Sequence, residues 1–100
     1  MDKEQYIRNM QETLRHYGIS GSEYAINKIR DNTVCLVHHD EIAEVFYYNR
    51  NTCMRTSEYD FIADACRAMI QMLAKAGKGE MLRYFEILCS RTEENGRGDR

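Results

Sequence analysis

The chain has 100 residues, of which 43% are hydrophobic and 30% charged, with a formal net charge of −2. This length suits one domain with one hydrophobic core, and the composition excludes a wholly disordered chain. A charge so near neutrality does not indicate direct nucleic-acid binding or attachment to a membrane surface, and the polar start of the sequence predicts neither a signal peptide nor a membrane span.

The first predicted element is an amphipathic helix over residues 3–17. Its apolar side chains recur at helical spacing on one face: Tyr6, Ile7, Met10, Leu14 and Tyr17. Gly18 follows directly and is a usual helix terminator.

Strands are predicted next, over residues 23–30, 33–39 and 42–50, with a short fourth strand over 52–56 that would lie at the edge. Asp31-Asn32 and residues 49–51 provide turn signals between them. Since parallel neighbours need a long crossover and these connections are short, we expect antiparallel pairing in a meander.

A second helix is predicted after Ser57, which would be its N-cap, with Asp60 as the acidic member of a capping box. A broad apolar stripe follows: Phe61, Ile62, Ala65, Cys66, Met69, Ile70 and Leu73. Residues 74–79 would end this helix, and residues 80–90 resume helical spacing. We expect a single domain over residues 1–90 and a flexible polar tail over 91–100.

This order, α-β-β-β-(β)-α-α, predicts an α+β domain: an antiparallel sheet of three to four strands with helices packed on one face. Such an arrangement leaves the other face of the sheet open unless something covers it.

The four cysteines, Cys35, Cys53, Cys66 and Cys89, lack the close paired spacing of a zinc site or a disulfide framework. We therefore expect buried, reduced thiols in a cytoplasmic protein. Cys66 lies on the apolar stripe, where a thiol is more often inert packing than a nucleophile. No catalytic motif and no cofactor motif is present, so the sequence predicts a protein that is not an enzyme.

The turn His38-His39-Asp40-Glu41 contains four side chains that can bind metals. Adjacent residues of an extended chain point to opposite faces, so His38 and His39 cannot easily share one ion. A solvated hairpin turn explains the four residues better than a metal site does.

The strongest functional signal is the strand that follows this turn. One face of it carries Ala43, Val45 and Tyr47, which contain no charge and suit the core. The other carries Glu44, Phe46, Tyr48 and Arg50, and two aromatic rings between an acid and a base are typical of protein-binding surfaces. With the acidic turn added, the predicted partner-binding residues are Asp40, Glu41, Glu44, Phe46, Tyr48 and Arg50. The alternative is that Phe46 and Tyr48 pack under a helix or against a second copy of the chain.

Residues 20–75 resemble the small α+β immunity proteins that are encoded beside toxins in bacterial polymorphic and contact-dependent toxin systems. The resemblance is carried by Tyr24-Ala-Ile, by Val45-Phe-Tyr-Tyr and by Phe61-Ile-Ala-Asp-Ala-Cys66. It implies a cytoplasmic protein that binds a cognate toxin domain, often a nuclease with a basic surface, and blocks its active site. Two other interpretations remain open: a homodimeric structural or adaptor protein, and a small ligand-binding protein with a cleft between sheet and helices.

Overall fold

The computed structural model describes residues 1–98 of the chain. Seven elements follow one another in the order helix, four strands, helix, helix: α1 (Lys3–His16), β1 (Tyr24–Ile26), β2 (Thr33–His38), β3 (Ala43–Asn49), β4 (Thr52–Tyr59), α2 (Ile62–Leu73) and α3 (Lys78–Gly98). The predicted α+β class and the predicted order of elements are confirmed.

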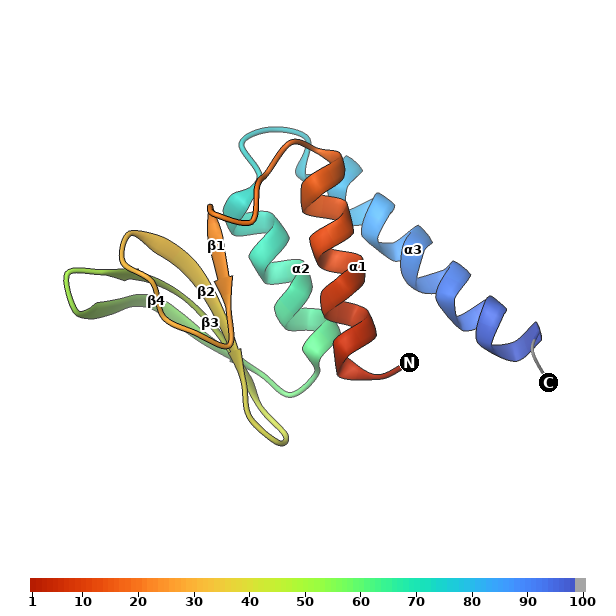
Figure 1. The fold of residues 1–100 in the computed structure, drawn as a ribbon, viewed down its shortest axis with the longest axis horizontal. Coiled ribbons are helices and arrows are strands. Elements are labelled where there is room, and N and C mark those ends of the chain that lie inside the picture. Colours follow the sequence, from red (N-terminus) through yellow and green to blue (C-terminus); the bar gives the residue numbers. More distant parts are fainter. Residues whose placement is uncertain (99–100) are drawn as a thin grey trace.

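The helices lie on one side of the sheet (Figure 1). Of the three, α2 packs directly on β2, β3 and β4, while α1 and α3 pack against α2 and against each other. The main core fills the space between these layers, and its largest fully buried side chains include Phe85, Met10, Leu14, Leu36 and Met69. The apolar stripe predicted for the second helix therefore faces the core, apart from its first residue, Phe61, which is exposed.

Local signals in the sequence set both ends of α1. The side chain of Asp2 caps the first turn by accepting a hydrogen bond from the backbone N–H of Gln5 at 2.8 Å. At the other end Gly18 adopts a left-handed φ of 81°. The N–H of Ile19 then donates to the carbonyl of Leu14, and that of Gly18 to Arg15, which is a Schellman motif.

The strand order is β1-β2-β3-β4, and the sheet is mixed. The prediction of a wholly antiparallel meander is wrong at β1, which pairs parallel to β2. A long crossover is unnecessary here because β1 has only three residues, so the loop over residues 27–32 can return the chain to the start of β2. Asn27 begins this return with a left-handed φ of 57°, which asparagine tolerates. Its N–H donates to Leu36, and its side-chain oxygen accepts from the N–H of His38 at 3.0 Å.

The return loop also covers part of the sheet face opposite the helices. There the thiol of Cys35 lies 3.9 Å from the carbonyl oxygen of Arg30, to which it donates. Ala25, Cys35 and Phe46 form a second, small apolar cluster on this side, with Val37 and Tyr48 packed against it. The sheet face opposite the helices, which was predicted to be open, is therefore partly covered by the return loop.

β3 and β4 form a hairpin whose two turn residues, Arg50 and Asn51, both have positive φ, as a type I′ turn requires. β4 lies at the edge and contains a bulge, because the register passes from Tyr47↔Met54 to Val45↔Ser57. Arg55 occupies the bulge with a φ of 55°.

The edge strand is longer than predicted and continues to Tyr59. Ser57 is consequently part of β4 and is not a helix cap, which corrects the predicted capping box. Phe61 is the N-cap residue of α2, and its side chain makes no capping hydrogen bond. The pairing of β4 with β3 overrides the local capping signal in this segment.

α3 continues past the predicted end at residue 90, and residues 91–98 are helical. The predicted flexibility of residues 91–100 stays a prediction, and its last two residues lie outside the described part of the chain. Among the helices of residues 1–98, none combines the length and the apolar character needed to cross a membrane.

Candidate protein-binding surface

The six predicted partner-binding residues do not form one surface. Asp40 and Glu41 lie in the β2–β3 turn and Glu44 at the start of β3, whereas Arg50 lies in the turn at the opposite end of that strand. The extended chain from Glu44 to Arg50 spans about 20 Å. Tyr48 pairs with Thr33 and Cys53 near the Arg50 end, so the predicted set divides into an acidic group and a distant remainder.

Phe46 does lie on the sheet face opposite the helices, as the alternation along β3 predicts. It is nevertheless only 3% exposed, because it belongs to the small apolar cluster beneath the return loop. Tyr48 is half-buried against the same cluster, and its hydroxyl donates to the side chain of Asn51 at 3.1 Å. Neither ring is freely presented to a partner, and Phe46 is part of a core.

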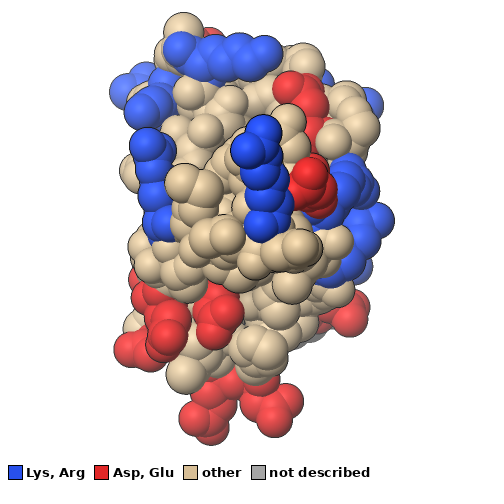
Figure 2. All heavy atoms as spheres, turned by 90° about the vertical axis from the view of Figure 1, so that its left-hand side faces the viewer, with Lys and Arg blue, Asp and Glu red and all other residues tan. Residues whose placement is uncertain are grey.

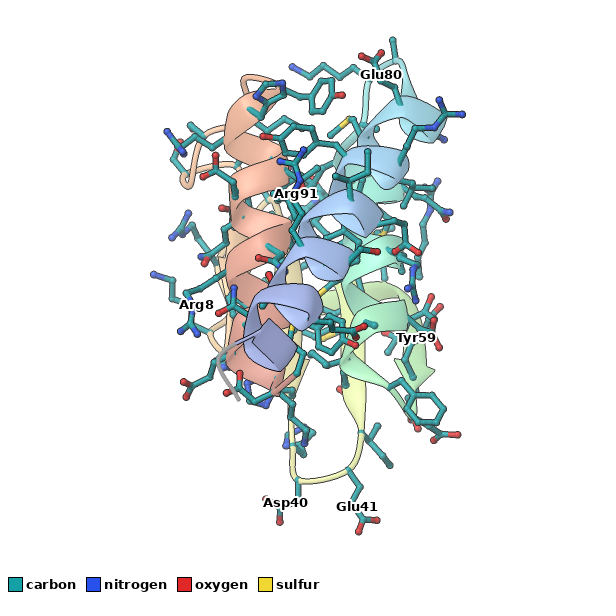
Figure 3. All side chains as sticks on the ribbon, turned by 90° about the vertical axis from the view of Figure 1, so that its right-hand side faces the viewer. Arg8, Asp40, Glu41, Tyr59, Glu80 and Arg91 are labelled. Atoms are coloured by element: carbon teal, nitrogen blue, oxygen red, sulfur yellow. The ribbon has the colours of Figure 1, made fainter. Side chains whose placement is uncertain are left out.

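The acidic residues that flank β2 lie at its two ends. Asp31 accepts a hydrogen bond from the N–H of Arg50 at 2.8 Å, so its carboxylate serves the β3–β4 turn. Asp40 and Glu41 lie beyond the other end of β2, at the tip of the β2–β3 turn (Figure 3).

At that end of the molecule the fold gathers acidic side chains that are distant in the sequence. We call the group of Asp40, Glu41, Glu44, Glu58 and Asp60 the acidic end. Four of these residues are exposed, and Glu44 is half-buried. An open hollow of about 500 Å³ lies among them, lined by His39, Asp40, Glu41, Ile42, Glu44 and Glu58. Figure 2 shows only acidic charges in the lower part of this side of the molecule, while Lys and Arg gather in the upper part.

Glu44 and Glu58 are direct cross-strand partners in the β3–β4 ladder. Since Ala43 and Val45 face the helices, both glutamates point to the opposite side of the sheet. Like charges directly opposite each other destabilise a sheet. Among residues 1–93, whose side chains the structure describes, ion pairs join Arg15 to Glu12 and Arg67 to Asp64 and Glu86, and none of them neutralises this pair.

Lys3 positions the acidic turn without neutralising it through an ion pair. Its ammonium group donates to the backbone carbonyl oxygens of His39, at 3.3 Å, and of Asp40. The start of α1 is therefore fastened to the β2–β3 turn, while the carboxylates of Asp40 and Glu41 extend away from the fold (Figure 3). The turn is held in place, and its charge remains available for a partner.

Ile42 and Phe61 are large apolar residues with exposed side chains at or beside the acidic end. Ile42 is 40% exposed and lines the acidic hollow. Phe61 is 70% exposed and follows Asp60 directly. Sequence reasoning missed Glu58 and Phe61 as surface residues because it assigned residue 57 onward to a capped helix with Phe61 in its core stripe. The length of β4 was the missing information.

A separate groove of about 380 Å³ lies between the β3–β4 end of the sheet and α2. It is lined by Val34, Tyr47, Met54, Arg55 and Met72. Met54 is 45% exposed, so this groove is open to solvent, and it shares no lining residue with the acidic hollow.

The thiols of the four cysteines differ in their burial. Cys35, Cys66 and Cys89 are buried free thiols as predicted, but Cys53 is exposed on the edge strand. Burial raises the pKa of Cys66 to about 12, so this thiol is protonated at neutral pH and suits packing rather than nucleophilic attack. No group of three or more potential metal ligands comes together among the described side chains, those of residues 1–93.

Comparisons of this chain with protein-family models, with curated proteins and with solved structures gave no match.

Proposed function

We propose that this chain is a non-catalytic, antitoxin-like protein of the cytoplasm that binds and neutralises a cognate toxin domain with a basic surface, through its acidic end. The observation that carries the proposal is the cross-strand pair of Glu44 and Glu58. Two facing carboxylates weaken the isolated protein, and a cationic partner relieves that repulsion when it binds. The resemblance of residues 20–75 to immunity proteins supports the same class of partner.

The rest of the acidic end suits the capture of such a partner. Asp40 and Glu41 project from the tip of a turn, away from the rest of the fold (Figure 3). Exposed carboxylates of one sign raise the association rate with a basic protein, and added salt screens this effect. The hollow between the turn and β4 provides a concave contact for a side chain of the partner.

The experiment uses this protein and the purified product of the gene encoded beside it. Affinity is measured by calorimetry at low and at high salt, for the wild type and for Glu44→Lys and Glu58→Lys. We expect 1:1 binding that weakens with salt and that falls by at least about tenfold in either variant.

Glu12→Lys is the matched control, since it makes the same charge change on α1, away from the acidic end. It is expected to alter the affinity by less than about twofold. A neighbouring product that does not bind, or an equal loss in the control variant, would contradict the proposal.

The division of charge on the sheet side favours a second candidate, a homodimer. The lower part of this side carries only acidic charges, while Lys and Arg gather in the upper part, where some acidic side chains also lie (Figure 2). A two-fold axis through such a surface places the acidic end of one copy against the basic part of another. Sedimentation equilibrium tests this: a dimer that dissociates in Glu58→Lys supports it, and a monomer at all concentrations refutes it.

A further inference from the structure

Phe61 combines two features that do not serve the fold. Its side chain is 70% exposed, the most of the large apolar residues that the structure leaves exposed. It is also the N-cap residue of α2, where Ser, Thr, Asp or Asn would accept a hydrogen bond from the first turn. The Phe61 side chain makes no such bond. Stability alone would favour a small polar residue at this position.

Its surroundings place Phe61 beside the acidic end. Asp60 precedes it, and Asp64 follows in the first turn of α2, with its N–H bonded to the carbonyl oxygen of Phe61 at 3.1 Å. Asp60, Phe61 and Asp64 line a shallow hollow of about 570 Å³, together with the cationic side chains of Lys3 and Arg67. Asp60 and Ile62 also line a smaller hollow beneath the β2–β3 turn, together with Glu41 and Ile42. The surface is therefore continuous from the acidic turn to the phenyl ring.

Single exposed hydrophobic residues are common on protein surfaces, and Ile29 is one here, at 56% exposure in the return loop. Phe61 differs because aromatic rings rimmed by charge are the residues that dominate binding energy in protein interfaces. Here the rim carries both signs: Asp60 and Asp64 on one hand, Lys3 and Arg67 on the other, with Arg67 paired to Asp64 at 2.8 Å. A matching pocket would be apolar with charged side chains at its edge.

We propose that Phe61 is the apolar anchor beside the acidic end: its ring enters an apolar pocket on the basic protein partner. This inference rests on the proposed function. The carboxylates steer the encounter, and the ring slows dissociation once it is buried. The two groups act on different steps, and kinetics can separate them.

The test measures association and dissociation rates with the neighbouring gene product by surface plasmon resonance, for the wild type, Phe61→Ser and Ile29→Ser. Phe61→Ser keeps the net charge and supplies an N-cap hydroxyl, so its melting temperature is expected to equal or exceed that of the wild type. Its affinity is expected to fall by about 30-fold, mainly through faster dissociation. Ile29→Ser removes an exposed apolar side chain outside the acidic end, and we expect its affinity to stay within about twofold of the wild type.

Glu44→Lys in the same series is expected to slow association instead. If Glu44→Lys weakens binding while Phe61→Ser does not, the anchor is refuted and the proposed function stands. A Phe61→Ser protein that melts well below the wild type also refutes the anchor, because the ring would then be structural. A wild type that does not bind overturns both proposals.

Discussion

Glu44 on β3 and Glu58 on β4 face each other across the ladder, on the side of the sheet away from the helices. The backbone hydrogen bonds that pair these strands thereby hold two negative charges together. Where a fold keeps such an unfavourable contact, the contact is a candidate for function.

Replacing one member of this pair with a cation is expected to stabilise the isolated protein. Glu58→Lys changes a repulsive cross-strand contact into an attractive one, which is worth about 0.2–1 kcal/mol and raises the melting temperature by a few degrees. The gain is expected to shrink as salt is added. Thermal denaturation followed by circular dichroism measures both effects.

Glu86→Lys makes the same charge change and serves as the control, because it is expected to change the melting temperature in the opposite direction. Arg67 bonds both carboxylate oxygens of Glu86, at 2.9 and 3.2 Å, so reversing this charge removes an attraction between α2 and α3. Its melting temperature is expected to fall slightly. If Glu58→Lys also lowers the melting temperature, the repulsion inferred between Glu44 and Glu58 is wrong.

Phe46 and Tyr48 are expected to respond differently to truncation. Phe46 is 3% exposed, so Phe46→Ala removes a packed ring and is expected to lower the free energy of unfolding by about 3–5 kcal/mol. Tyr48 is half-buried, and Tyr48→Ala is expected to cost clearly less. Urea denaturation of both variants decides the point, and equal losses would mean that Phe46 is not in a core.

The sequence predicted the face of β3 correctly but not the state of that face. Alternation along the strand places Phe46 opposite the helices, because successive side chains point to opposite sides. Phe46 is buried in a small cluster with Ala25 and Cys35, and the carbonyl of Arg30, in the loop over residues 27–32, lies 3.9 Å from the thiol of Cys35. That loop was predicted as part of a long strand and a turn. A contact between a loop and a distant strand leaves no periodic signal, so it could not be found from the pattern of apolar residues.

Asn27 is expected to be the residue on which the parallel return most depends. Alanine tolerates a left-handed φ less well than asparagine does, so Asn27→Ala strains the backbone at its φ of 57°. The substitution also removes the side-chain oxygen that accepts a hydrogen bond from the N–H of His38. Asn27→Gly removes the acceptor but relieves the backbone strain. We expect both variants to be destabilised, Ala by about 1–2 kcal/mol and Gly by less. Urea denaturation that finds Gly the worse substitution would contradict this account.

Stability is expected to fall at alkaline pH, partly because of Cys66. Burial raises the pKa of this thiol from 9.0 to about 12. The unfolded chain therefore releases the proton at about pH 9, while the folded protein keeps it until about pH 12. The stabilisation is complete below pH 9 and is lost as the pH rises from about 9 to 12.

Urea denaturation at pH 7 and pH 10, with a reductant present, measures this loss. Cys66→Ala is expected to reduce the difference between the two pH values. Part of it is expected to remain, since burial also raises the pKa of Tyr6, Tyr24 and Cys89. Cys53→Ala, which removes an exposed thiol, is expected to keep the wild-type difference. An unchanged difference in Cys66→Ala would contradict the role assigned to Cys66.

The candidate surface was predictable in part. Asp40, Glu41 and Glu44 were found because they are close in the sequence and no lysine or arginine interrupts them. Glu58 and Phe61 were not found, since their place depends on where β4 ends. Pairing with β3 sets that end, and a serine followed by an aspartate three residues later suggested a helix cap instead.

The bulge at Arg55 has a consequence for how the protein behaves when it is concentrated. An edge strand as long as β4 would ordinarily offer a template on which strands of other molecules can stack into fibrils. Arg55 breaks the regular ladder near the middle of the strand and carries a charge there, so an incoming chain meets only short regular stretches on either side. We therefore expect the bulge at Arg55, besides bending β4, to disfavour aggregation through this edge of the sheet.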